Sequence, residues 1–140
     1  LKGAYAFFAD LARAIRIPVR VDFIIVTSYG TQTKTSGKVK LVTELTEKIK
    51  NRDVLLVEDI VDSGLTIQYL TKALAKQRPR SIKVCTLLSK PERRVVDVPL
   101  QYIGFKIQDQ YVVGYGLDYQ QQYRNLPYLA VLDQLNQQEE

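Results

Sequence analysis

Six residues near the middle of the chain combine acidic and small polar side chains in one short stretch. They are Glu58, Asp59, Asp62, Ser63, Gly64 and Thr66. The branched apolar run 54–57 before them favours a strand buried on both faces of a parallel sheet. Apolar residues at Ile67, Leu70 and Leu74 favour an amphipathic helix directly after them. A small-residue turn at a helix N-terminus offers free backbone N–H groups and the positive end of the helix dipole, so the stretch predicts an anion site.

The acids distinguish this turn from loops that bind nucleoside triphosphates. The patterns GxxxxGK[ST] and GxGxxG are both absent from it. Carboxylates in front of a phosphate-binding turn accept hydrogen bonds from vicinal hydroxyl groups, or hold Mg²⁺ that those hydroxyls share. A phosphate at the helix and a sugar at the acids describe a ribose 5-phosphate. The alternative is an ordinary strand-to-helix turn with Asp62 as N-cap, which leaves Glu58 and Asp59 unexplained.

The composition narrows the possible chemistry. The 140 residues include no histidine, which excludes histidine-based triads, HExxH zinc sites and histidine proton relays. A general base must therefore be a carboxylate, lysine, tyrosine or cysteine. The net charge of +5 favours anionic substrates, but the basic residues are scattered, so we expect no nucleic-acid partner. No apolar run approaches membrane-spanning length, and the single Cys85, in an apolar stretch, fits a core position in a cytoplasmic protein.

The central stretch closely resembles the phosphoribosyl-pyrophosphate (PRPP) signature of type I phosphoribosyltransferases, most of all the hypoxanthine-guanine branch. Further segments extend the resemblance over nearly the whole chain. These segments are 1–4 (LKGA), 86–90 (TLLSK), 111–119 (YVVGYGLDY) and 123–127 (YRNLP). The resemblance implies an α/β fold, with a parallel sheet flanked by helices and a small hood, in one domain over residues 1–140. It also implies purine salvage, with transfer of the phosphoribosyl group from PRPP to hypoxanthine or guanine, release of pyrophosphate and use of Mg²⁺.

The resemblance also implies a role for each site residue. The loop for the ribose and 5-phosphate comprises Glu58, Asp59, Asp62, Ser63, Gly64, Leu65 and Thr66. Asp62 matches the catalytic base near N7 of the purine. The pyrophosphate would meet Lys2, Gly3, Ser28, Tyr29 and Arg124, and the metal would meet Glu58, Asp59 and Asp118. The purine side would comprise Lys90 at the 6-oxygen, Tyr111 stacking on the base, the backbone of Val112, and Asp118.

Other interpretations remain open. One is a phosphoribosyltransferase for xanthine or adenine, and another is a non-catalytic regulator that binds PRPP or nucleotides. The family also favours homodimers and homotetramers. In that family the opening Leu-Lys-Gly follows a buried strand, so we expect that a segment precedes Leu1 and that residues 1–140 alone do not form a stable enzyme.

Apolar periodicity and turn residues predict the remaining elements. We expect helices over 4–16 and 65–77 and a brief helical stretch over 44–50. Strands are expected over 21–27, which is mostly apolar and therefore internal, and over 39–43, 82–88, 101–105 and 128–132. Residues 28–37 are expected to form a lid, Asn51 a left-handed turn, and Arg93 and Arg94 a solvated surface turn. The carboxyl ends of parallel strands meet at one edge of the sheet, so Glu58, Asp59 and Lys90 should converge there.

Overall fold

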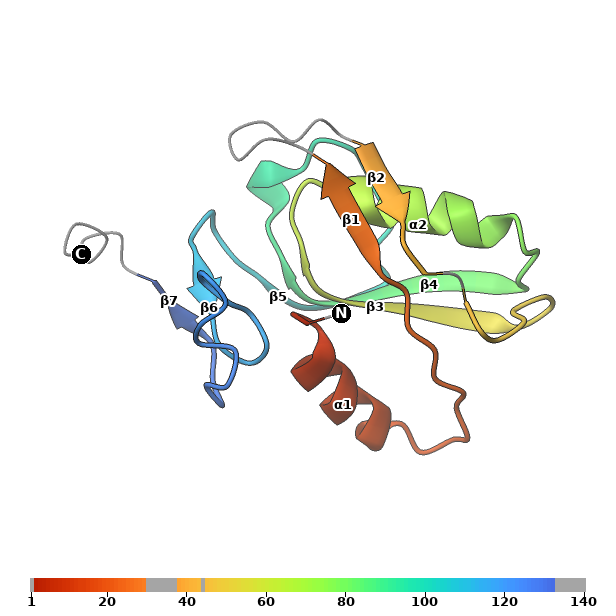
Figure 1. Ribbon diagram of the computed structural model, residues 1–140, viewed down its shortest axis with the longest axis horizontal. Helices are drawn as coiled ribbons and strands as arrows, with labels where there is room; N and C mark the ends of the chain where they lie inside the picture. The colour runs from red at the N-terminus through yellow and green to blue at the C-terminus, as the bar shows by residue number, and fades with distance from the viewer. Residues whose placement is uncertain (1, 30–37, 44, 133–140) are drawn as a thin grey trace.

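A parallel three-stranded sheet forms the centre of the structure, a computed structural model that describes residues 2–29, 38–43 and 45–132 (Figure 1). Its strands are β3 (Asp53–Val61), β4 (Ser81–Ser89) and β5 (Tyr102–Lys106), in the order β3-β4-β5. Cys85 sits at the middle of the register, opposite Val57 on one side and Tyr102 on the other. The predicted parallel α/β sheet is therefore confirmed, and β5 is at its edge as expected.

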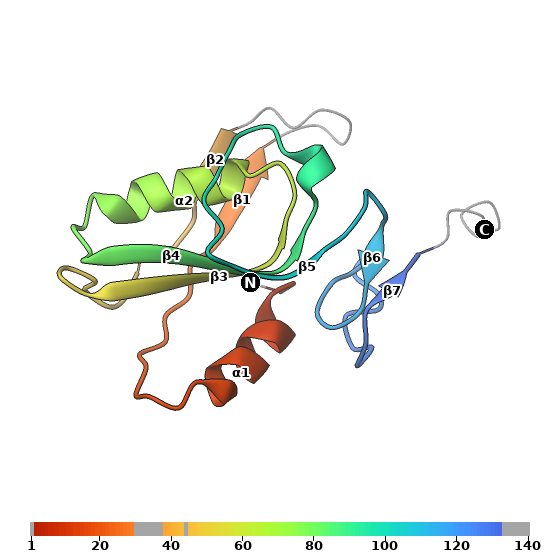
Figure 2. The ribbon, with the colours of Figure 1, turned by 180° about the vertical axis from the view of Figure 1, so that it is seen from behind.

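Two helices flank this sheet. Helix α2 (Leu65–Ala75) connects β3 to β4, and α1 (Tyr5–Ala14) precedes the strands. Figures 1 and 2 show α1 and α2 on opposite sides of the sheet in both views. Both helices are shorter than the sequence predicts. No helix in the described part of the chain has both the length and the apolar character needed to cross a membrane.

The predicted internal strand over 21–27 is wrong. Strand β1 (Val26–Tyr29) starts later and pairs antiparallel with β2 (Lys38–Leu41), in a two-stranded sheet separate from the main one. Val21 and Phe23 are 46% and 47% exposed. Apolar composition alone therefore overstated the burial of this segment.

Side-chain hydrogen bonds explain why residues 45–50 form no helix, although we expected one over 44–50. The carboxylate of Asp22 accepts the backbone N–H groups of Thr46 and Glu47, at 2.8 and 2.9 Å. Such bonds compete with the helical hydrogen-bond pattern, and the described residues of this stretch form bends and turns instead. The predicted left-handed turn at Asn51 is confirmed by its φ of 59°.

A second antiparallel pair forms a small accessory unit set apart from the main sheet (Figures 1 and 2). It consists of β6 (Val112–Val113) and β7 (Ala130–Val131), so the last strand is shorter than expected. The short 3-10 helix η1 (Pro91–Arg93) lies between β4 and β5. Together these elements give the expected small unit beside the sheet.

Two buried clusters hold the sheet to its neighbours. The first joins Val61 of β3, Ile67 of α2, Val84 of β4 and Val98. The second joins Leu87 and Leu88 of β4 to Leu117. Cys85 is buried as predicted, and burial raises the pKa of its thiol. On β3, however, Leu55 is 39% exposed, so the strand is well buried only at its carboxyl end, contrary to the prediction of burial on both faces.

Replacing Ile67 with alanine should lower the free energy of unfolding by about 2–5 kcal/mol, because the side chain is 1% exposed and its loss leaves a cavity between β3 and α2. Chemical denaturation followed by circular dichroism measures the change. The control is Val95→Ala, which trims a branched apolar side chain that is 72% exposed and should change stability by less than about 0.5 kcal/mol. Equal losses in the two variants would contradict the assigned core.

Candidate active site

The turn between β3 and α2 requires glycine for two reasons. Gly64 is the N-cap of α2 and has φ +85° and ψ −9°, a left-handed conformation. A Cβ atom there would also lie 2.8 Å from the carbonyl oxygen of Val96. Among the described residues, the backbone N–H groups of Thr66 and Ile67 donate to no acceptor. The first turn of α2 therefore presents free donors, as an anion site needs.

The segment after β4 holds this turn in place. The backbone N–H groups of Val95 and Val96 donate to Ser63 O at 2.9 and 3.2 Å, and Lys90 N donates to Val61 O at 3.0 Å. Arg94 is half-buried and donates to Ser89 Oγ at 2.8 Å, so it is not the solvated surface residue that we expected. Sequence reasoning missed this support because it joins residues some thirty positions apart through backbone groups, which carry no sequence signal.

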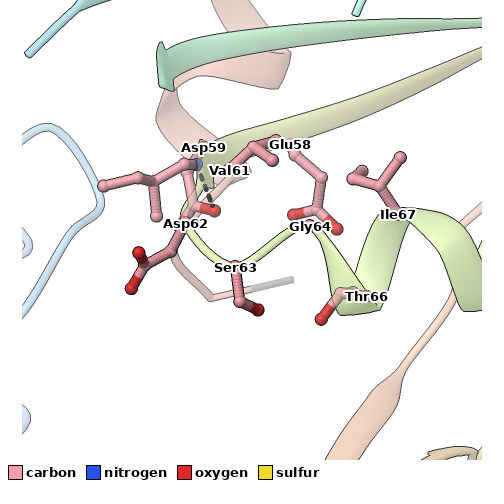
Figure 3. Close-up of a pocket in the computed structure, with 9 residues that line it drawn as sticks. Glu58, Asp59, Val61, Asp62, Ser63, Gly64, Thr66 and Ile67 are labelled. Atoms are coloured by element: carbon pink, nitrogen blue, oxygen red, sulfur yellow. Dashed lines mark hydrogen bonds between the residues drawn. The ribbon is translucent and has the colours of Figure 1, made fainter. Parts of the chain in front are cut away.

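A hollow of about 230 Å³ opens beside the turn. Figure 3 shows the hydroxyl groups of Ser63 and Thr66 directed toward the space between them, with the Asp62 carboxylate directed away from Thr66. Glu58 and Asp59 line the same hollow from the end of β3. The structure thus brings together the acids, the hydroxyls and the free N–H groups that the sequence predicted as one site.

Burial disfavours the ionised forms of Glu58 and Asp59. It raises the pKa of Glu58 to about 7, with a smaller contribution from the negative charge of Asp59 beside it. Burial also raises the pKa of Asp59, against the hydrogen bond from Ile60 N to its Oδ1 at 2.9 Å and the more distant charge of Arg124. A cation or sugar hydroxyl groups in the hollow would stabilise the ionised forms.

The residues predicted for pyrophosphate lie on the other side of Asp59. A side chain on Gly3 would overlap the carboxylate of Asp59, and one on Gly116 would overlap the carbonyl oxygen of Gly3, so these backbones are in close contact. Arg124 Nη1 donates to Gly116 O at 2.9 Å. Lys2 and Gly3 form a turn just before α1. Lys2, Gly3 and Arg124 therefore converge beside the acids.

The remaining pyrophosphate residues are described only in part. Ser28 and Tyr29 belong to β1, but their side chains and the lid loop over 30–37 lie outside the described residues. The roles predicted for them stay predictions.

The purine-side residues line a neighbouring region. Lys90 is 8% exposed, and its Nζ lies 3.5 Å from Asp109 Oδ1. Tyr111 is exposed and donates its hydroxyl hydrogen to Asp118 O at 3.2 Å. Val112 begins β6. Asp109 is the member of this region that sequence reasoning missed.

The three carboxylates predicted to hold metal do not gather into one cluster. No group of three possible metal ligands occurs among the residues described. Asp118 instead pairs with Arg124 Nη2 at 2.8 Å and accepts Gln121 N at 2.8 Å. Mg²⁺ commonly binds through only one or two carboxylates, with water and substrate phosphates completing its coordination. The adjacent carboxyl groups of Glu58 and Asp59 fit that pattern, whereas a cage made by all three acids does not fit.

Comparisons with known proteins agree with this geometry. Residues 1–120 match the family model described as phosphoribosyl transferase domain. The hypoxanthine-guanine phosphoribosyltransferase of Mycobacterium avium is 51% identical over 95% of this chain and 66% of its own length. The hypoxanthine phosphoribosyltransferase of Salmonella typhimurium is 48% identical over 93% of this chain and 73% of its own length. This chain therefore spans about two thirds to three quarters of these relatives.

Solved structures give the same result. A hypoxanthine phosphoribosyltransferase of Staphylococcus aureus has a TM-score of 0.90 and 43% identity, over 95% of this chain and 72% of its own. A hypoxanthine-guanine phosphoribosyltransferase of Bacillus anthracis, with a HEPES molecule in its active site, has a TM-score of 0.90 and 49% identity, over 95% of this chain and 78% of its own. The fold is that of type I phosphoribosyltransferases.

In the absence of metal ions, the free energy of unfolding should fall as pH rises from 4.5 through 7. In this window folded Glu58 keeps a proton that the unfolded chain, with its ordinary pKa of 4.5, has released. The raised pKa of Glu58 corresponds to about 3 kcal/mol lost by pH 8. Glu58→Gln should flatten this dependence, as measured by urea denaturation in EDTA between pH 4.5 and 8. The exposed Glu92→Gln is the control and should keep the wild-type slope; an unchanged slope in Glu58→Gln would contradict the assigned pKa.

Proposed function

The chain belongs to the phosphoribosyltransferase family, in its hypoxanthine-guanine branch, and we propose that it transfers the 5-phosphoribosyl group of PRPP to a 6-oxopurine. Its reaction is purine salvage: hypoxanthine or guanine becomes IMP or GMP, with release of pyrophosphate. The observation that carries the proposal is that Glu58, Asp59 and the free N–H groups of α2 line one hollow, and that the backbone of the buried Lys90 bonds to Val61, which also lines it. Together these groups match a ribose 5-phosphate and an oxygen-bearing base.

The predicted residues divide the tasks of this reaction. Thr66, Ser63 and the N-terminus of α2 bind the 5-phosphate, while Glu58 and Asp59 face the ribose hydroxyls. During transfer the bond from C1′ to N9 forms, and the bond from C1′ to the pyrophosphate oxygen breaks. Asp62 accepts the proton that the purine ring loses.

The leaving group and the base need further residues. Lys2, Gly3 and Arg124 bind pyrophosphate, for which the guanidinium fork of Arg124 is suited. On the other side, Lys90 donates to the 6-oxygen and Tyr111 stacks on the ring. Val112 reads the purine edge through its backbone, and Asp118 keeps Arg124 in position through their ion pair.

We propose Mg²⁺ as the cofactor, held by Glu58 or Asp59 together with oxygens of PRPP. When bound, the ion draws negative charge from the departing pyrophosphate. The support is the pair of adjacent carboxyl groups whose pKa values burial raises, since a nearby cation would favour their ionised forms.

The direct test is to mix the protein with PRPP, Mg²⁺ and one base at a time, and to measure nucleotide and pyrophosphate. With hypoxanthine or guanine, the protein should form nucleotide and pyrophosphate in equal amounts. With adenine it should form almost none of either. Reaction with xanthine or adenine alone would reassign the base. Binding of PRPP without product from any base would indicate a non-catalytic regulator.

We further propose a homodimer or homotetramer in the cytoplasm. The support for assembly is the row of exposed apolar side chains before β1, which includes Ile17, Val21 and Phe23. The buried free Cys85 supports a reducing compartment. Light scattering at several protein concentrations tests the assembly, and a monomer at all of them would refute it.

Asp62→Asn should lower kcat by about 10²–10⁴-fold, because the amide keeps the shape of the side chain but removes its basicity. The KM for PRPP should change little. The measurement is steady-state kinetics with hypoxanthine. Asp97→Asn, on an exposed position, is the matched control and should retain full activity. An unchanged kcat in Asp62→Asn would refute its role as base.

Lys90→Gln should lower kcat/KM for hypoxanthine and narrow the difference from adenine. An ammonium group only donates hydrogen bonds, so it suits a 6-oxygen and rejects the 6-amino group, whereas an amide both donates and accepts. Sites of this kind discriminate by roughly 10⁴–10⁵. Lys76→Gln, exposed at the end of α2, should leave both rates unchanged. Adenine matching hypoxanthine in the wild type would overturn the role of Lys90.

A further inference from the structure

Four charged side chains of alternating sign form a continuous line from the phosphate turn to the purine side. Asp62 Oδ1 lies 2.9 Å from Arg93 Nε. Arg93 Nη1 donates to Asp109, at 3.3 Å from Oδ1 and 3.5 Å from Oδ2. Asp109 Oδ1 in turn lies 3.5 Å from Lys90 Nζ. The line thus joins the turn after β3, the helix η1 and the loop after β5.

We propose that Arg93 and Asp109 are positioning residues that fix the distance between the proton acceptor Asp62 and the purine-reading Lys90. The proposal rests on the function proposed above. Arg93 holds Asp62 directly and holds Lys90 through Asp109. Proton acceptance at the ring and recognition of the 6-oxygen are then set by one rigid connection.

The chemistry of arginine suits this bridge. The charge of a guanidinium is spread over three nitrogens in a fixed plane, so Arg93 pairs with Asp62 through Nε and with Asp109 through Nη1. A lysine carries its charge on a single nitrogen and does not reproduce these two positions. The backbone of Arg93 is itself restrained, because η1 begins with Pro91 and Arg93 N donates to Lys90 O at 3.2 Å.

Lys90 depends on Asp109 more than an exposed lysine would. Its side chain is 10% exposed, and Asp109 is its one ion-pair partner among the described residues. A buried ammonium without a partner is costly, and it turns toward whatever acceptor it can reach. With Asp109 on one side, the remaining N–H donors of Lys90 point to a fixed place where the 6-oxygen can bind.

The two ion pairs that Arg93 makes, with Asp62 and with Asp109, contribute little to stability. The side chains of Arg93, Asp109 and Asp62 are 52%, 46% and 42% exposed, and ion pairs at such positions contribute about 0–1 kcal/mol. Their effect on activity can therefore be separated from folding. Arg80 offers a matched comparison: it is also an exposed arginine paired with an aspartate, Asp53, but at the amino end of β3, roughly 26 Å along the strand from the turn.

The experiment compares the wild type with Arg93→Ala, Arg93→Lys, Asp109→Asn and Arg80→Ala, each as the full chain. KM for hypoxanthine, KM for PRPP, kcat and melting temperature are measured, and IMP binding is measured by calorimetry. Arg93→Ala should raise the hypoxanthine KM and lower kcat, by about tenfold to a hundredfold in kcat/KM. Its PRPP KM and melting temperature should match those of Arg80→Ala.

The other variants separate the two contacts that Arg93 makes, one with Asp62 and one with Asp109. Asp109→Asn should raise the hypoxanthine KM and weaken IMP binding with little change in kcat, because Arg93 still holds Asp62. Arg93→Lys should recover only part of the loss, since one ammonium nitrogen does not reproduce the two separate positions, Nε and Nη1, from which Arg93 pairs with Asp62 and Asp109. Arg93→Ala kinetics equal to those of Arg80→Ala, in an active wild type, would overturn this inference alone. A wild type that neither binds IMP nor makes it would overturn the proposed function and this inference with it.

Discussion

The site depends on the close backbone contact between the phosphate turn and the segment that follows β4. Val95 and Val96 donate to Ser63 O, and the space around Gly64 is so tight that a Cβ would meet Val96 O. Lys90 belongs to the same segment and bonds through its backbone to Val61 at the end of β3. The part of the site that faces the phosphate and the part that faces the base therefore cannot shift independently. This coupling suits a reaction in which both substrates must be held at a bonding distance.

The acids at the end of β3 destabilise the folded site. Burying Glu58 and Asp59 side by side costs free energy, which is why the pKa of each is raised. The apolar cluster of Val61, Ile67 and Val84 joins the end of β3 to α2 and β4 and offsets that cost. Apolar contacts at the turn thus stabilise the fold, whereas the acids that destabilise it lie where a cation and sugar hydroxyls would bind them.

Much of this arrangement is readable in the sequence. The strand, turn and helix from Asp53 to Ala75 follow from local patterns, because apolar periodicity and a glycine at a left-handed position act over a few residues. The strand over 21–27 was mispredicted since burial depends on which segments pair, and here the Asp22 carboxylate, bonded to Thr46 and Glu47, shapes the chain. Arg94 and Asp109 were missed because their roles depend on side-chain contacts made in the folded chain, with Ser89 and with Lys90 and Arg93, and neither belongs to a recognisable motif.

The thiol of Cys85 is a chemical probe of local opening in the sheet. Its thiol is enclosed in β4, between β3 and β5, and burial raises its pKa, so the reactive thiolate is scarce in the folded protein. It is also the sole thiol of the chain. The rate at which an alkylating reagent labels the protein therefore follows the opening of β4 from its neighbours. Because only one thiol can react, the labelled protein has a single added mass, and its rate of appearance measures how often the central sheet opens locally.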